Sequence, residues 1–209
     1  MCDVTSAPGP FSRAGKRAKR VEQINEAAAR VFIRDGHGQF SARKVAKELG
    51  ISLNNLQHYC GNTQNLCLQM ITARLAYFVQ GVDRLVADAS PATPLERLAV
   101  AIRENSAATL DADTARFFFQ VGALASYDPA IKAQMARQYD SFLEGICQLV
   151  ADIDPQLPAE TVRTYAALIA TQIDGNFFYQ DQLQAGTGQR ERLVEAAINL
   201  WANVLAPRV

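Results

Sequence analysis

The sequence predicts an all-α protein with a small helical head at the N-terminus and a larger helical body. Apolar residues recur at helical spacing along almost all of the 209 residues, and no segment alternates with period two as a half-buried strand would. Glycines, prolines and capping residues divide this pattern into short and long helices. Hydrophobic residues make up 49% of the chain and charged residues 20%, which is typical of a globular protein and excludes a wholly disordered one.

The head is expected to contain one long helix and two short ones. The first covers residues 17–35, where an apolar stripe ends at a glycine. Ser41 is placed to cap a short helix that ends at Gly50, and Ser52 is placed to cap a second short helix that runs to about Tyr59.

The body is expected to begin with a long helix that Asn62 caps. Prolines in residues 89–94 interrupt the pattern and mark a linker. The later helices are expected at about 95–110, 112–126, 129–152, 160–182 and 189–205. The predicted division is a flexible basic arm over 1–16, a head over 17–62 and a body over 63–209.

The zero net charge is a cancellation between head and body. Residues 11–60 contain ten basic and four acidic residues, whereas residues 61–209 contain eleven basic and sixteen acidic ones. A basic head on an acidic body is typical of a protein that binds nucleic acid through the head. The alternative is an ordinary helix with a solvated basic face.

The segment 40–66 predicts a helix-turn-helix. Gly50 allows a sharp turn between the two short helices, and Ala46 allows them to approach closely. The second short helix displays amide side chains, which can make paired hydrogen bonds to adenine edges in the major groove. A purely structural helical hairpin, the alternative, would usually carry Lys and Glu on that face.

This segment resembles the TetR family of bacterial transcriptional regulators. The residues that carry the resemblance are Ile24, Ala27, Ala28, Phe32, Gly36, Phe40, Ser41, Val45, Ala46, Leu49, Gly50, Ile51, Ser52, Leu56, Tyr59 and Leu66. Beyond residue 70 the resemblance is architectural. It implies a three-helix head that binds DNA and a larger helical domain that dimerises and holds a pocket for a small-molecule inducer.

The resemblance also implies which residues bind DNA. Residues of the second short helix would face bases or phosphates, and residues close to that helix would bind the phosphate backbone of the DNA. The DNA-binding residues that the resemblance implies are Ser41, Arg43, Leu53, Asn54, Asn55, Gln57, His58, Tyr59 and Thr63. Arg17 and Lys44 are expected to bind DNA as well, because the second short helix is uncharged and electrostatic affinity must come from basic residues near it. The sequence departs from the family at Gln57, Cys60 and Thr63, where an aromatic residue, a Phe and a basic residue are common. Without the cation at Thr63, the phosphate contact rests on backbone N–H groups at the helix start.

The last two helices are more broadly apolar than the surface of a monomer requires. They are therefore expected to form a four-helix interface between two subunits, although the same breadth fits helices central to a monomer core. The expected interface residues are Val162, Ala166, Ile169, Ile173, Leu193, Ala197, Leu200, Trp201 and Val204. A two-fold homodimer predicts double-stranded DNA with a roughly palindromic operator as its partner.

A ligand pocket is expected in the body. Three consecutive aromatic residues at 117–119 cannot all face one core, so at least one lines a cavity or an interface. The candidate ligand-binding residues are Arg103, Asn105, Phe118, Gln120, Tyr139, Asn176 and Phe177.

Other classes of protein fit less well. Both histidines, His37 and His58, lie in the head, and the body has no catalytic or metal-binding motif. Four cysteines without zinc spacing predict free thiols, so no metal and no cofactor is expected. The charge-free run 51–73 is too rich in amides to span a membrane, and residues 1–20 are not a secretory signal, which predicts a cytoplasmic protein.

Together these observations predict a ligand-responsive transcriptional regulator, more specifically a repressor that an unidentified inducer releases from its operator. The alternatives are a helical binding or adaptor protein without operator specificity and a helical enzyme.

Overall fold

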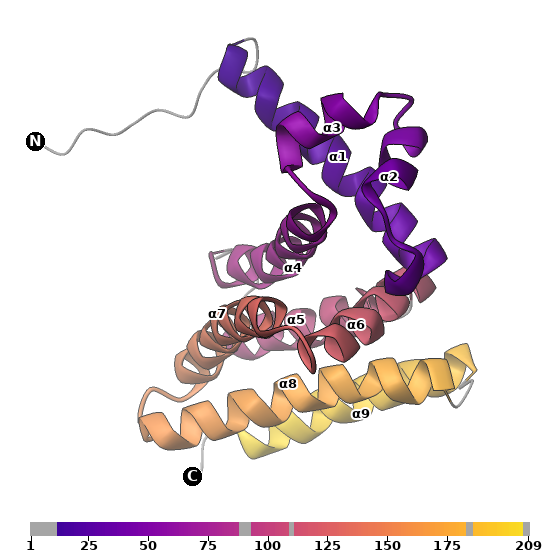
Figure 1. Ribbon diagram of the computed structural model, residues 1–209. Coiled ribbons are helices and arrows are strands. Elements are labelled where there is room, and N and C mark those ends of the chain that lie inside the picture. The colour runs from indigo at the N-terminus through magenta and orange to yellow at the C-terminus, as the bar shows by residue number, and fades with distance from the viewer. Residues whose placement is uncertain (1–11, 88–92, 109–110, 183–185, 207–209) are drawn as a thin grey trace, which may run out of the picture. The chain divides into compact units, whose positions relative to one another are not determined.

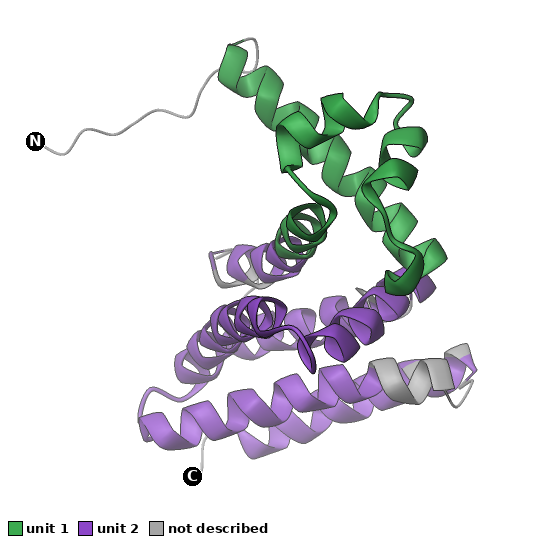
Figure 2. Cartoon of the chain, viewed as in Figure 1, with its two compact units in different colours: residues 1–74 green, residues 75–209 purple. Residues whose placement is uncertain are grey.

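The computed structural model divides the chain into two compact units, residues 1–74 and residues 75–209 (Figure 2). It describes the backbone of residues 12–87, 93–108, 111–182 and 186–206, and their side chains except those of 82, 85–86, 108, 177–182, 187 and 190. Every regular element in these residues is helical, as the sequence predicts. Within them, no helix has both the length and the apolar character needed to cross a membrane.

The described residues of unit 1 form three α-helices, one short 3-10 helix and the start of a fourth α-helix (Figure 1). Their bounds are α1 (Arg13–Asp35), the 3-10 turn η1 (His37–Gln39), α2 (Ala42–Glu48), α3 (Leu53–Cys60) and α4 (Thr63–Ala87). The core forms because one face of each helix is apolar: Ile24, Phe32, Val45, Leu56 and Leu66 are all buried. Capping side chains set the helix starts, since Ser41 and Ser52 accept hydrogen bonds from the backbones of α2 and α3.

The basic arm was expected over residues 1–16, and the end of that range is wrong. Helix α1 begins at Arg13, four residues earlier than expected, because the Ser12 hydroxyl accepts a hydrogen bond of 2.9 Å from the Gly15 N–H and caps the helix. Arg13 and Lys16 therefore belong to an ordered helix. The remainder of the expected arm, residues 1–11, lies outside the described residues.

The described residues of unit 2 form the rest of α4 and five further helices. These are α5 (Pro94–Ala108), α6 (Ala112–Ala125), α7 (Pro129–Ile153), α8 (Ala159–Gln182) and α9 (Thr187–Val204). In the described part of the expected linker, Pro94 is the first residue of α5, a position where proline lacks no hydrogen bond. Leu98, Ile146, Leu149, Ile169 and Trp201 meet in its main core cluster, to which α5, α7, α8 and α9 contribute. Figure 1 shows α8 and α9 running side by side.

The boundary between head and body falls later than expected. It lies within α4, between Arg74 and Leu75, rather than after residue 62. The first turns of α4 belong to the head because Leu66 and Met70 are buried there, and because the Gln69 amide donates to Asn25 of α1 at 2.8 Å.

Candidate DNA-binding face and ligand cavity

Helices α2 and α3 form a helix-turn-helix whose turn depends on Gly50. This residue has φ +64°, in the left-handed region. Its N–H donates to the Lys47 carbonyl at 3.1 Å, and the Ile51 N–H donates to the Ala46 carbonyl at 3.0 Å. This pair of bonds is a Schellman motif, which ends α2 and turns the chain into α3.

Helix α3 presents a row of uncharged polar side chains to solvent. Leu56 and Cys60 are buried and hold α3 against the rest of unit 1, whereas the amides and the imidazole on the other face are exposed. The exposed residues of α3 are Asn54, Asn55, Gln57 and His58. Leu53 and Tyr59, also expected on the DNA-binding face, are half-buried. The exposed face offers donors and acceptors of the kind that read base edges.

The first turns of α1 lie beside the end of α3. The Arg17 guanidinium lies 5.2 Å from the centre of the Tyr59 ring, a cation–π contact, and the His58 ring packs edge-on to Tyr59 at 5.5 Å between centroids. Three of the expected DNA-binding residues are thereby brought together.

An ion-pair network connects α1 to α2. Glu48 accepts from Arg34 at 3.1 Å and from Arg30 at 3.4 Å, while Asp35 accepts from Arg34 at 2.8 Å and pairs with Lys44 at 2.9 Å. Hydrogen bonds lower the pKa of the Asp35 and Glu48 carboxyls below their ordinary values, and the bond from Arg34 has the largest effect on each. The network engages Lys44, one of the expected DNA contacts.

The cations that remain for a phosphate backbone lie elsewhere in the head. Among the described residues, Arg43 and Lys47 of α2 are exposed and form no ion pair within the chain. Ser41 and Thr63 have structural partners: the Ser41 hydroxyl accepts from the Lys44 N–H, and the Thr63 hydroxyl accepts from the Ala42 N–H, each at 3.4 Å. Thr63 thus links the starts of α2 and α4.

Unit 2 contains a cavity of about 260 Å³ between α4, α5, α6, α7 and α8, which is partly open to solvent because Tyr139 and Asp174 in its wall are exposed. Aromatic and aliphatic side chains form most of its wall. The lining residues are Leu75, Phe78, Val79, Asn105, Phe118, Phe119, Met135, Gln138, Tyr139, Phe142, Ile173 and Asp174. The expected division of the aromatic triplet is confirmed, because Phe117 is fully buried in the core while Phe118 and Phe119 line the cavity.

Asp174 and Tyr139 form a polar pair in the cavity wall. The Tyr139 hydroxyl donates a short hydrogen bond to the Asp174 carboxylate. Although both residues are partly exposed, desolvation by the cavity wall raises the pKa of Asp174, and the bond from Tyr139 opposes part of this rise. Desolvation and the adjacent carboxylate both raise the pKa of Tyr139. Asp174 was not among the residues predicted from the sequence. The available signal was an isolated carboxylate directly after Ile173, in the middle of a broadly apolar helix.

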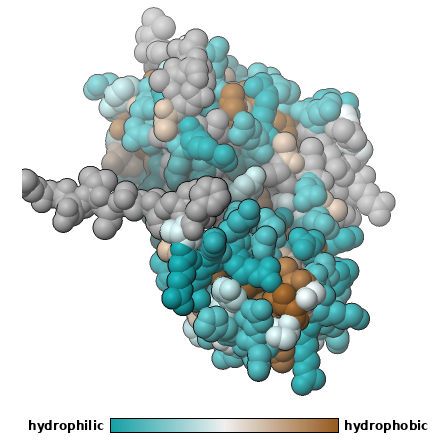
Figure 3. Space-filling model, turned by 90° about the horizontal axis from the view of Figure 1, so that it is seen from above, coloured by the Kyte–Doolittle hydropathy of each residue, from teal (hydrophilic) through white to brown (hydrophobic). Residues whose placement is uncertain are grey.

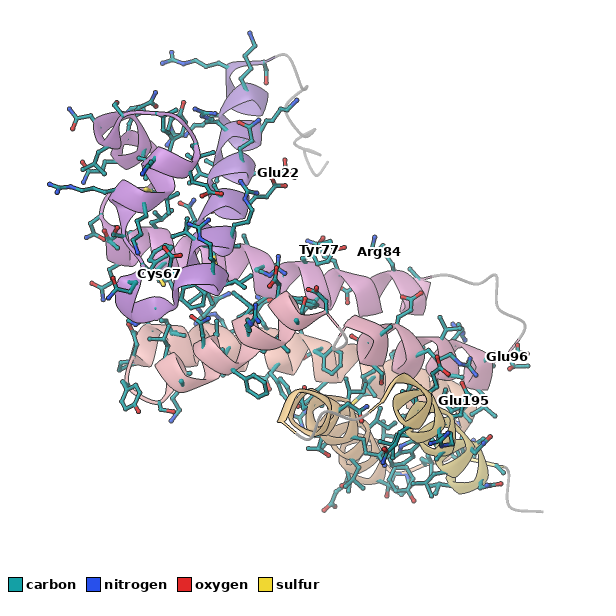
Figure 4. All side chains as sticks on the ribbon, turned by 90° about the vertical axis from the view of Figure 1, so that its right-hand side faces the viewer. Glu22, Cys67, Tyr77, Arg84, Glu96 and Glu195 are labelled. Atoms are coloured by element: carbon teal, nitrogen blue, oxygen red, sulfur yellow. The ribbon has the colours of Figure 1, made fainter. Side chains whose placement is uncertain are left out.

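Three of the candidate ligand-binding residues line the cavity: Asn105, Phe118 and Tyr139. Arg103, Gln120 and Asn176 are not in its wall, which corrects their expected placement. Arg103 is instead paired with Glu195 of α9 at 2.8 Å, and the Asn176 amide donates to Ser106 at 3.3 Å. Figure 4 shows Glu195 on α9. The side chain of Phe177 lies outside the described residues.

The expected interface residues divide into two groups. Val162, Ala166, Ile169, Ile173 and Trp201 are buried in the core of their own unit, so they are not free to meet a second subunit; this corrects the prediction for all five. The broad apolar pattern of α8 and α9 led to the wrong prediction because these helices contribute to the core of the monomer. Leu193, Leu200 and Val204 of α9 remain at least 37% exposed, and Ala197 is half-buried.

Exposed apolar side chains occur elsewhere too. The coloured surface in Figure 3 is mainly hydrophilic, with small hydrophobic patches. Tyr77 is 65% exposed and projects from the same side of α4 as Arg84 (Figure 4). Leu168 of α8 is 50% exposed and joins the apolar residues that α8 and α9 offer to solvent.

The cysteines and acidic residues of the described chain form no evident catalytic or metal centre. Cys60, Cys67 and Cys147 are free thiols, and Cys2 lies outside the described residues. Burial raises the pKa of Cys60 and of Cys147 above the ordinary value of a thiol. Within the described residues, no three His, Cys, Asp or Glu side chains gather as they would around a metal ion.

Neither a family model nor a curated protein sequence matches this chain, but solved structures do. A TetR transcription regulator from Haloarcula marismortui aligns with a TM-score of 0.73 at 18% identity, over 90% of this chain and 97% of its own. This chain has the TetR fold.

Two further structures with this fold were solved with small molecules. The transcriptional regulator FadR from Bacillus subtilis, in complex with stearoyl-CoA, aligns with a TM-score of 0.68 at 17% identity, over 85% of this chain and 97% of its own. A protein from Saccharomonospora viridis, described as a transcriptional regulator and in complex with choline, aligns with a TM-score of 0.71 at 19% identity, over 89% and 96%. The TetR fold confirms the predicted all-α class.

Proposed function

We propose that this protein is a sequence-specific DNA-binding transcriptional regulator. The observation that carries the proposal is the exposed face of α3, where Asn54, Asn55 and Gln57 project from the second helix of a helix-turn-helix. Amides in this position can make bidentate bonds to adenine. Arg17 of α1, which lies over the Tyr59 ring, and the exposed Arg43 and Lys47 of α2 can supply cations for the phosphate backbone. The other expected backbone contacts are His58, Tyr59 and Thr63, at the end of α3 and the start of α4.

The proposed active form is a homodimer on a roughly palindromic operator. Leu193, Leu200 and Val204 leave a line of apolar side chains exposed on α9, and Leu168 adds another on α8. Apolar surface of this kind is commonly covered by a second subunit. Two-fold symmetry then places two copies of α3 on two half-sites.

The proposed regulation is release of a repressor by a small-molecule inducer. The cavity in unit 2 is large and apolar enough to hold a small molecule, and two proteins with the same fold contain ligands. A dimer that occupies a promoter blocks polymerase without any activating surface, which favours repression. A regulator of this kind acts where the genome lies, so the proposed location is the cytoplasm.

Selection of bound sequences from a random pool of duplex DNA tests this function. The full-length protein should enrich a palindrome with two half-sites about one helical turn apart. A matched variant, Asn55→Ala with Gln57→Ala, should lose the enrichment while it still retains DNA at low salt. Recovery of unrelated sequences alone would contradict sequence-specific regulation.

The salt dependence of binding to random duplex DNA separates this function from that of an adaptor protein. Each phosphate contact that is lost should reduce the slope of log K against log salt by about one. Arg43→Ala should show this reduction in full. Lys44→Ala should show less, because Lys44 is already paired with Asp35. An affinity for DNA that does not change with salt would favour the adaptor.

A further inference from the structure

The wall of the cavity in unit 2 has an uneven distribution of charge. Among the described residues that line it, Asp174 is the one charged side chain, and no Lys, Arg or His is present. Asn105 and Gln138 supply neutral polar groups, and the Asn105 amide already donates to the Ala101 carbonyl at 2.8 Å. A ligand that enters therefore meets one negative group and no positive one.

The Asp174 carboxylate has a single hydrogen-bond partner among the described residues, the Tyr139 hydroxyl. A carboxylate accepts up to about four hydrogen bonds, so one neutral donor leaves most of its capacity unused. A ligand that displaces water from this carboxylate without supplying a positive charge pays a cost in free energy. The site is therefore electrostatically suited to a ligand that brings a positive charge.

Aromatic rings make up much of the rest of the wall. Phe78 and Phe118 lie 5.0 Å apart between centroids, and Tyr139 and Phe142 lie 6.1 Å apart. Phe119 also lines the cavity. The faces of aromatic rings carry partial negative charge and attract cations, most strongly where water is excluded. Five rings and one carboxylate thus favour the same sign of charge in a ligand.

We propose that the cavity binds an organic cation with an apolar body, such as a quaternary ammonium or a protonated amine that carries alkyl or aryl groups. The charged nitrogen lies near Asp174, and the apolar groups fill the space between Phe78, Phe118 and Phe142. Carboxylates and phosphates are disfavoured, because the wall has no described cation to neutralise them. The proposal rests on the ligand response proposed above and specifies its chemistry.

Calorimetric titration of the full-length protein tests this selectivity with three probes of the same chain length: octyltrimethylammonium, octanol and octanoate. The ammonium should bind at least about tenfold more tightly than octanol, and octanoate should bind more weakly than either. Octanoate binding as tight as that of the ammonium would overturn the proposal.

Variants assign the selectivity to the wall. Asp174→Asn keeps the shape and should weaken ammonium binding at least about tenfold while leaving octanol binding unchanged. Asp140→Asn removes an exposed carboxylate of α7 that does not line the cavity, and should change neither. Tyr139→Phe removes the hydroxyl and keeps the ring, so ammonium binding should persist. Equal ammonium affinity in Asp174→Asn and the parent protein would overturn the assignment.

A second variant keeps the test decisive if Asp174→Asn does not fold. Phe118→Leu replaces an aromatic face by an aliphatic group, and should weaken ammonium binding about threefold to tenfold with little change for octanol. Equal losses for both probes would show a purely apolar site and contradict the proposal.

Operator binding by the same preparations distinguishes the two proposals. If the protein binds its operator but shows no preference for the ammonium, the proposed ligand class is wrong and the regulatory function is unaffected. If the protein binds the ammonium selectively but binds no DNA sequence specifically, the regulatory function is wrong and the ligand class is still supported.

Discussion

Gly50 is the residue on which the geometry of the helix-turn-helix depends most directly. Its φ of +64° is strained for any residue with a side chain, although a Cβ there would meet no atom within 4 Å. We expect Gly50→Ala to reduce the free energy of unfolding by about 1–2 kcal/mol, the cost of a left-handed backbone for an L-residue. Urea unfolding of the full-length protein measures the change.

Gly38→Ala is the matched control for this substitution. Gly38 is exposed, has open space around its Cα and has no left-handed φ, so its replacement should leave the free energy of unfolding within about 0.5 kcal/mol of the parent value. Equal losses for both variants would mean that the turn does not require glycine.

Asn55 and Gln57 carry the proposed base recognition because their side chains are exposed on α3. Replacement of either by alanine should weaken binding to the selected operator by about 1–3 kcal/mol and leave binding to random DNA nearly unchanged. Competition titrations with operator and random duplexes provide the comparison. Gln39→Ala, which removes an exposed amide outside α3, should affect neither. If both kinds of DNA lose the same affinity, these amides do not read bases.

At the scale of elements, the ion pairs between α1 and α2 make the stability of the head depend on pH. Arg34 donates to Asp35 and Glu48, and their pKa values lie below the ordinary 3.8 and 4.5. A lowered carboxyl pKa contributes stability above the ordinary value, and this contribution is lost as the pH falls through the value in the folded protein.

Arg34→Ala should therefore lower the melting temperature near neutral pH, with a gap to the parent protein that closes as the pH falls below 3.8. Differential scanning calorimetry across this range follows the gap. Arg116→Ala breaks a pair with Asp113 whose side chains are both more than 60% exposed, and should have little effect at any pH. A gap that persists in acid would indicate lost packing rather than lost ion pairs.

Helix positions were predictable from the sequence because local signals determine them. Asn62 accepts a hydrogen bond from the Asn65 N–H at 2.8 Å, so α4 begins where the predicted cap indicated. Helix α7 begins at Pro129, as expected from the pattern, and Asp128 caps it. The start of α1 was missed because its cap, Ser12, precedes a run of charged residues with no apolar stripe. The boundary within α4 was missed because a continuous helix carries no local sign of which unit buries it.

The two candidate sites differed in how much the sequence revealed. The exposed face of α3 follows from one short amphipathic helix, so its display of Asn54, Asn55 and Gln57 was predictable. The cavity draws side chains from five helices, and Asp174 joins Tyr139 only through tertiary packing. An apolar pattern likewise does not distinguish a core face from an interface face, which is why Trp201 was misassigned.

At the scale of the whole molecule, the proposed function depends on pairing two copies of the chain. Leu200 is 49% exposed in the exposed apolar line of α9, and a lysine there would place a charge in the proposed interface. Leu200→Lys should therefore shift the protein from dimer to monomer in sedimentation velocity. Because a monomer contacts one half-site at a time, affinity for the palindrome should fall by about 10²–10⁴-fold.

The matched control is Tyr127→Lys, which adds the same charge at a residue that is 85% exposed and lies outside α8 and α9. It should leave both the dimer and the operator affinity unchanged. Loss of operator affinity by Leu200→Lys without dissociation of the dimer would separate the two effects and place the subunit contact elsewhere. Loss of both together would tie the apolar line on α9 to the spacing of the two recognition helices, since only a dimer holds them one helical turn of DNA apart.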